Sequence, residues 1–143
     1  MKTTEFCFIV PAVPPTVNHY TGVARNGRRF RKPAADGFDL LVQAEWAKHN
    51  HPQIVAAAYA VDILIQLGAK RKGREPDLDN FCKVGIDALV HAQIITDDSR
   101  ITDLSLHKQR GDCEQTVFTI RALVGSTEDF PVKLRGLWVK TPF

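Results

Sequence analysis

The chain has 143 residues, of which 44% are hydrophobic and 24% are charged, and its net charge at pH 7 is +3. This length suits a single domain, and the composition excludes a disordered or low-complexity chain. No stretch reaches the roughly 18 apolar residues that cross a membrane, and the apolar part of the N-terminus is too short for a signal peptide. We therefore expect a cytoplasmic protein without a membrane partner.

The three cysteines, Cys7, Cys82 and Cys113, are far apart in the sequence and form no CxxC pair. This spacing indicates neither a zinc framework nor a disulfide framework. We expect free thiols in a reducing compartment.

The N-terminal half predicts a strand, an irregular segment and a helix. A β-rich run from Glu5–Val10 ends before a proline, as strands do. Glycines and basic residues over Thr16–Pro33 predict a long loop or a loose hairpin. Apolar residues then recur at a helical period from Asp36 or Gly37 to about His49, so a helix is expected there.

The middle of the chain predicts a strand, a basic loop and a second helix. The run Tyr59–Leu67 is rich in β-branched and aromatic residues and predicts a strand. A basic segment, Gly68–Arg74, follows it. Asn80 is a good helix N-cap residue, and an apolar stripe from Phe81 to Ala92 predicts the helix that it would begin.

Two further strands are expected at Ile101–Lys108 and Thr116–Val124, with a turn at Gly111 and Asp112 that makes them candidate hairpin partners. The order β, α, β, α, β, β predicts one α+β domain over residues 1–124, with a small mixed sheet packed against two helices. Residues 125–143 are an extension of open role, either packed on the core or free to contact a partner.

Charge is segregated along the chain. Two basic segments precede an acidic stretch, and basic segments of this kind bind the phosphates of nucleic acid. The alternative is that they are solvated loops. The candidate DNA-binding residues are Arg25, Arg28, Arg29, Arg31, Lys32, Lys70, Arg71, Lys72 and Arg74.

Asp77 and Asp79 are separated by a single leucine. If this segment is extended, both carboxylates point to one side, where they repel each other unless a cation lies between them. Carboxylate oxygens suit Mg²⁺, with Mn²⁺ as a possible substitute. The alternative is that Asp79 and Asn80 are simply a helix-capping segment, and that Asp97 and Asp98 form a turn.

A third acid, Asp98, would reach the pair if a helix leads away from Asp77 and Asp79 and an extended segment leads back. A helix over residues 81–92 is about 18 Å long at 1.5 Å per residue, and an extended run over residues 93–98 returns about 20 Å at roughly 3.3 Å per residue. These lengths predict that Asp97 or Asp98 lies beside the helix N-terminus, where an anion is favoured. Lys83, in the first helical turn, would face the same phosphate.

The run PDLDNFCKVGIDAL from Pro76–Leu89, followed by TDDSRI from Thr96–Ile101, resembles the RusA family of Holliday-junction resolvases, which are small endodeoxyribonucleases of bacteria and phages. A second, weaker match lies in the proline-rich segment Pro14–Tyr20, which contains Asn18. The resemblance covers roughly residues 5–123.

The resemblance implies a Mg²⁺-dependent homodimer that makes paired cuts in a four-way DNA junction. Carried over by position, Asp77, Asp79 and Asp98 would be the catalytic, metal-binding acids, and Lys83 the essential lysine. Asn18 would either touch DNA or order its own loop.

Two features depart from the family pattern. Glu75 and Pro76 stand where some members carry more arginines, so DNA contacts there are expected to differ. The segment after Val124 lies outside the family core. Two other functions stay open: a Mg²⁺-dependent nuclease for other branched DNA, and a non-catalytic DNA-binding protein.

Overall fold

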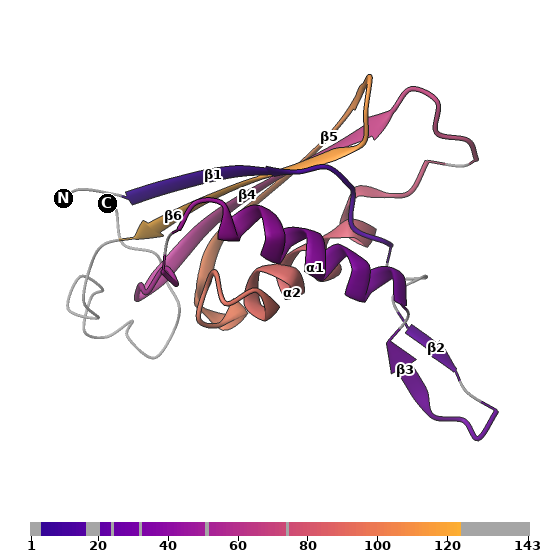
Figure 1. Ribbon diagram of the computed structural model, residues 1–143, viewed down its shortest axis with the longest axis horizontal. Coiled ribbons are helices and arrows are strands. Elements are labelled where there is room, and N and C mark those ends of the chain that lie inside the picture. The colour runs from indigo at the N-terminus through magenta and orange to yellow at the C-terminus, as the bar shows by residue number, and fades with distance from the viewer. Residues whose placement is uncertain are drawn as a thin grey trace.

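The structure, a computed structural model, describes residues 4–16, 21–23, 25–31, 33–50, 52–73 and 75–123. These residues form one small α+β domain with a projecting hairpin (Figure 1). The elements are β1 (Thr4–Val10), β2 (Thr21–Val23), β3 (Arg29–Arg31), α1 (Pro33–Ala47), β4 (Ala58–Gly68), the 3-10 turn η2 (Leu78–Phe81), α2 (Cys82–His91), the 3-10 turn η3 (Asp98–Arg100), β5 (Ile101–Gly111) and β6 (Gln115–Leu123).

The main sheet has the strand order β1-β6-β4-β5. Strand β6 is antiparallel to both of its neighbours, whereas β4 and β5 run parallel and are connected through α2. The mixed sheet and the two helices confirm the predicted fold class. Within the described residues, β2 and β3 pair only with each other, which confirms the loose hairpin.

The predicted hairpin pairing of the last two strands is wrong. A short turn joins β5 to β6, but β4 lies between them in the sheet. The reason is burial: β4 carries four buried apolar side chains on one face, from Val61, Ile63, Ile65 and Leu67, and occupies the centre. Most residues of β5 are exposed or half-buried, and a polar strand of this kind is tolerated at a sheet edge.

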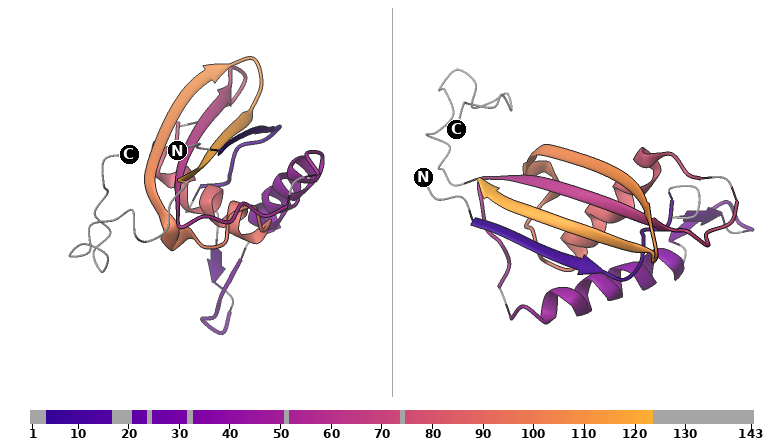
Figure 2. Two further views of the ribbon diagram at one scale, coloured as in Figure 1. Left: turned by 90° about the vertical axis from the view of Figure 1, so that its left-hand side faces the viewer. Right: turned by 90° about the horizontal axis from the view of Figure 1, so that it is seen from above.

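Both helices cover the same face of the sheet, and the core lies between these layers (Figure 2). Phe118 of β6 stacks on Phe8 of β1 with ring centroids 5.3 Å apart. Gly85 of α2 lies so close to the sheet that an added Cβ would be 3.6 Å from Ile63. In the described part of the chain, no helix has the length and apolar character needed to cross a membrane.

The second helix begins differently from the prediction. Asn80 is not an N-cap but lies inside η2, where its backbone N–H donates to the carbonyl of Asp77 at 3.1 Å. Phe81 is the N-cap residue of α2 and makes no side-chain capping bond. All three cysteines are free thiols, as expected. Residues 124–143, which include the predicted extension, lie outside the described residues.

Candidate active site

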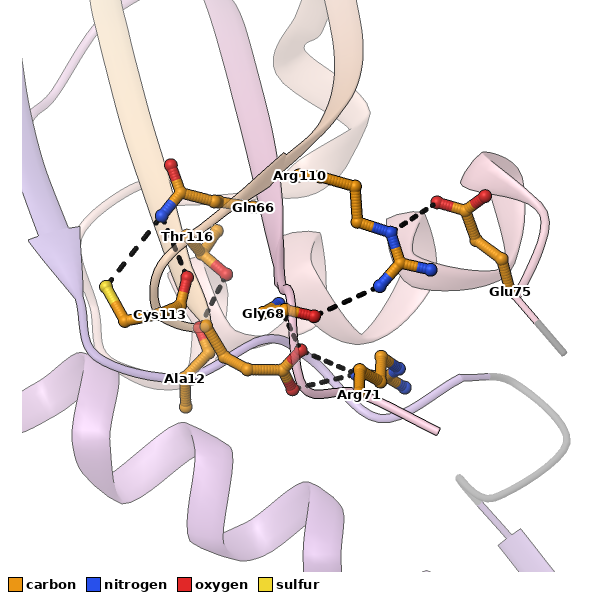
Figure 3. Close-up of polar contacts among 9 residues, drawn as sticks. Ala12, Gln66, Gly68, Arg71, Glu75, Arg110, Cys113 and Thr116 are labelled. Atoms are coloured by element: carbon orange, nitrogen blue, oxygen red, sulfur yellow. Dashed lines mark hydrogen bonds and ion pairs between the residues drawn. The ribbon is translucent and has the colours of Figure 1, made fainter. Parts of the chain in front are cut away.

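The basic loop after β4 is fixed at its beginning to the turn between β5 and β6. The Arg71 guanidinium donates to both carboxylate oxygens of Glu114, at 2.8 and 3.1 Å, and the same carboxylate accepts from the backbone N–H of Gly68 at 2.9 Å (Figure 3). Arg71 was predicted to contact DNA. In this structure its side chain makes an ion pair within the chain, and the DNA contact stays a prediction.

The loop is fixed a second time where it ends. The Lys108 ammonium of β5 donates to the Pro76 carbonyl at 3.1 Å. The Glu75 carboxylate lies 3.8 Å from Lys108 Nζ and 3.6 Å from Arg110 Nε. Arg110 also donates to the Gly68 carbonyl at 3.1 Å. The segment that leads to the acid pair is therefore attached to an edge strand.

The acid pair lies at the entrance to α2, and both carboxyl-bearing residues are exposed. Asp77 is extended (φ −66°, ψ 146°), but the extended path stops there because Asp79 already lies in η2. Burial raises the pKa of the Cys82 thiol, and the negative charges of Asp79 and Asp87 raise it further. The predicted contact between Lys83 and Asp87 is confirmed at 3.4 Å. Acidic charge thus gathers around the first turn of α2.

The segment before Asp98 is held by neutral hydrogen bonds to a buried tyrosine. The hydroxyl oxygen of Tyr59, a fully buried residue of β4, accepts from the backbone N–H of Thr96 at 3.2 Å and lies 3.1 Å from Thr96 Oγ1. The Tyr59 hydroxyl donates to the carbonyl of Ile54. Ile54 in turn pairs with Ile95 in a short parallel bridge.

Asp97 and Asp98 follow directly. The Asp97 carboxylate accepts from the backbone N–H of Ser99 at 3.0 Å and caps η3. Hydrogen bonds from the backbone and side chain of Ser99, and then one with the Asp98 side chain, lower the pKa of Asp97, and the Arg100 charge adds a smaller effect. Both acids are exposed: Asp97 caps η3, and Asp98 is the first residue of η3.

The two acid-bearing segments lie at opposite ends of β5. Ile101, just after η3, pairs with the beginning of β4, whereas Lys108, which holds the carbonyl before Asp77, pairs with Ile65 near its end. Seven residues of strand separate Ile101 from Lys108, which is about 23 Å at roughly 3.3 Å per residue. Figure 1 shows the same arrangement: α2 begins beside the acid-bearing loop and ends near the segment that leads into β5.

Asp97 or Asp98 was predicted to lie beside the N-terminus of α2. Within a single copy of the chain this prediction is wrong. Gln93 has a positive φ of 57°, and the N–H groups of Ile94 and Ile95 bond back to the carbonyl of Leu89. Both isoleucines are fully buried, so hydrophobic burial rather than extension determines this path. The strand that returns is β5, which begins only after Asp98.

Exposed carboxylates are suitable donors for Mg²⁺, so the chemistry of the acids fits this metal. The acids of one copy do not form a complete metal site. In the described ranges, no three side chains of Asp, Glu, His or Cys lie close enough to share a metal ion.

A family model described as "Endodeoxyribonuclease RusA" matches residues 11–121. The chain belongs to the RusA family. RusA proteins are endonucleases that act on Holliday junctions, and the small α+β domain agrees with the RusA fold. The matched span contains both acid-bearing segments and both attachments of the basic loop. A search of curated proteins found no match.

The structure also places several of the basic residues predicted for RusA-type DNA binding. Arg25 and Arg28 are exposed at the tip of the β2–β3 hairpin. Gly27, between them, has a φ of 83°, and the Asn26 side chain accepts from the backbone N–H of Arg28 at 3.0 Å. The hairpin projects away from the main sheet (Figure 1), and its turn carries these two exposed cations.

The remaining candidates for DNA binding fall into three groups. Arg29 and Arg31 belong to β3, and Lys70 and Lys72 are exposed on the basic loop. The predicted residues outside the described part of the chain are Asn18, Lys32 and Arg74.

Sequence reasoning missed Lys108, Arg110 and Tyr59, which attach the acid-bearing segments of this RusA protein. The charges on β5 are visible in the sequence, but their position beside Glu75 depends on the parallel pairing of β5 with β4. Tyr59 fits the pattern of an ordinary strand residue, because the sequence does not show which groups its hydroxyl will bond to.

Proposed function

We propose that this RusA-family protein is a Mg²⁺-dependent endodeoxyribonuclease that resolves four-way DNA junctions as a homodimer, by paired symmetric nicks, in DNA recombination and repair. The observation that carries the proposal is the RusA match over residues 11–121, which includes all three candidate acids and Lys83. The exposed cations of the β2–β3 hairpin and of the basic loop supply surfaces suited to phosphate.

We propose that Asp77 and Asp79 of one copy and Asp98 of a second copy hold the Mg²⁺, with Mn²⁺ as a substitute. Two observations support this: the acids are exposed, and those of one copy lie at opposite ends of β5. A twofold axis perpendicular to β5 would place each end of this strand in one copy near the opposite end in its partner, so a dimer of this kind would contain two equal sites. Bound Mg²⁺ polarises a phosphate and lowers the pKa of a coordinated water.

Lys83 is the residue that we assign to the phosphate itself. It lies in the first turn of α2 with its side chain 60% exposed, and Asp87 holds its ammonium at 3.4 Å. A cation in this position stabilises the charge that develops on a phosphate during attack. The positive end of the α2 dipole contributes in the same direction.

The test is to incubate the protein with four-way, flap and duplex DNA, in Mg²⁺ or in EDTA. We expect paired nicks at symmetric positions in the four-way junction, in Mg²⁺ only. Metal-dependent cutting of flaps in preference to junctions would favour a nuclease of other branched DNA. Junction binding without any cutting would favour a non-catalytic binding protein.

A further inference from the structure

Lys108 of edge strand β5 contacts the chain immediately before the acid pair Asp77 and Asp79. Its ammonium donates to the Pro76 carbonyl at 3.1 Å. That carbonyl belongs to the peptide bond joining Pro76 to Asp77. Because the peptide bond is planar, fixing its oxygen also fixes the direction in which the chain enters Asp77.

The local sequence makes this single hydrogen bond effective. The ring of Pro76 fixes its own φ, and the residue before a proline, Glu75, is restricted to extended conformations. Asp77 is itself extended, with φ −66° and ψ 146°. Few torsions are free between the contact and the carboxylate of Asp77, so a shift of the Pro76 carbonyl moves that carboxylate with it.

Glu75 and Arg110 keep Lys108 in place. The carboxylate of Glu75 lies between the two cations, 3.8 Å from Lys108 Nζ and 3.6 Å from Arg110 Nε. Arg110 is itself attached to the Gly68 carbonyl at 3.1 Å (Figure 3). The carboxylate offsets the repulsion between the two neighbouring cations and connects them to the end of β4.

We infer that Lys108 is a positioning residue for DNA cleavage, which fixes the Pro76–Asp77 peptide and thereby the carboxylate of Asp77, with Glu75 and Arg110 as its supports. This inference rests on the proposed catalytic role of Asp77. Lys108 acts through the backbone and needs no contact with DNA. Displacing a reacting group by about 1 Å costs on the order of 100-fold in rate.

The experiment compares three variants with the native protein in junction cleavage at saturating Mg²⁺. Lys108→Met keeps the length of the side chain but removes the donor, and we expect kcat to fall about 10- to 100-fold. Lys108→Arg keeps a donor and should recover kcat to within about threefold of the native value, because the guanidinium also reaches a carbonyl. Glu75→Gln should cause a smaller loss of kcat than Lys108→Met.

Binding of the uncut junction in EDTA distinguishes positioning from a direct DNA contact. We expect Lys108→Met to bind as tightly as the native protein, to within about twofold, because its partner is a protein carbonyl. The matched comparison is Lys70→Met, which removes the same charge from an exposed residue of the basic loop and should weaken binding. Melting temperatures verify that all the variants are folded.

Two results would overturn the inference while leaving the proposed function intact. One is native kcat in Lys108→Met; the other is a loss confined to binding and KM, which would make Lys108 a phosphate contact. If the native protein itself does not cut junctions in Mg²⁺, the proposed function fails and the inference fails with it. A lower kcat with unchanged binding, restored by arginine, supports the inference.

Discussion

The two acid-bearing segments are held in the fold by contrasting means. Thr96, two residues before Asp98, is bonded to the hydroxyl of a fully buried tyrosine, Tyr59. Pro76, next to Asp77, is bonded to a lysine whose side chain is 27% exposed and whose other partner is the carboxylate of Glu75. Salt screens exposed charges strongly and buried neutral hydrogen bonds hardly at all. We therefore expect added salt to weaken the attachment at Pro76 and to leave the attachment at Thr96 nearly unchanged.

The largest effect is expected when an acid itself is changed. Asp79→Asn should slow junction cleavage by more than about 100-fold, since even indirect partners of a metal ion contribute 10- to 100-fold. Junction binding in EDTA should be retained, because the change removes negative charge near the phosphates. The control is Asp112→Asn, at an exposed acid in the turn between β5 and β6. Retained cleavage in Asp79→Asn would contradict the assignment.

The buried attachment is tested by Tyr59→Phe. This change removes one hydroxyl and leaves the carbonyl of Ile54 and the N–H of Thr96 without their partner. Loss of a buried partner costs roughly 1–3 kcal/mol, so the free energy of unfolding should fall by that amount in denaturant titration. Cleavage should slow without a change in its salt dependence. An unchanged free energy of unfolding would show that the hydroxyl does not hold the segment.

The smallest effect is expected at the β2–β3 hairpin, which projects from the domain in Figure 1. Changing both Arg25 and Arg28 to glutamine should reduce the slope of log K against log salt by up to about 1.8, since each phosphate contact contributes about 0.9. Fluorescence anisotropy with a labelled junction measures this slope. An identical slope would favour a solvated turn over a DNA-binding arm.

Much of the fold could be predicted because local patterns determine it. The strands near Glu5–Val10 and Tyr59–Leu67 are found within one residue of their predicted limits, since β-branched and aromatic runs carry a strong signal. The order of strands could not be predicted, because it depends on which strand buries most apolar surface. No pattern in the sequence of β5 indicates that it will run parallel to β4.

The sequence suggested candidate residues for the site but not their arrangement. The spacing of Asp77 and Asp79 indicated a cation site, and the i, i+4 rule placed Lys83 beside Asp87. Comparing the length of the helix with the length of the segment after it could not place Asp98. The burial of Ile94 and Ile95 keeps the chain near the end of α2 and leaves Asp98 at the far end of β5.

The most direct test of the two-copy site mixes two inactive variants, Asp79→Asn and Asp98→Asn, under conditions in which subunits exchange. If Asp98 of one copy completes the site of the other, each mixed dimer has one intact site, and random mixing restores about a quarter of the native sites. Junction nicking should then recover to about that level, whereas either variant alone stays inactive. If mixing restores no nicking although exchange is demonstrated, the three acids act within one copy and the proposed two-copy site is wrong.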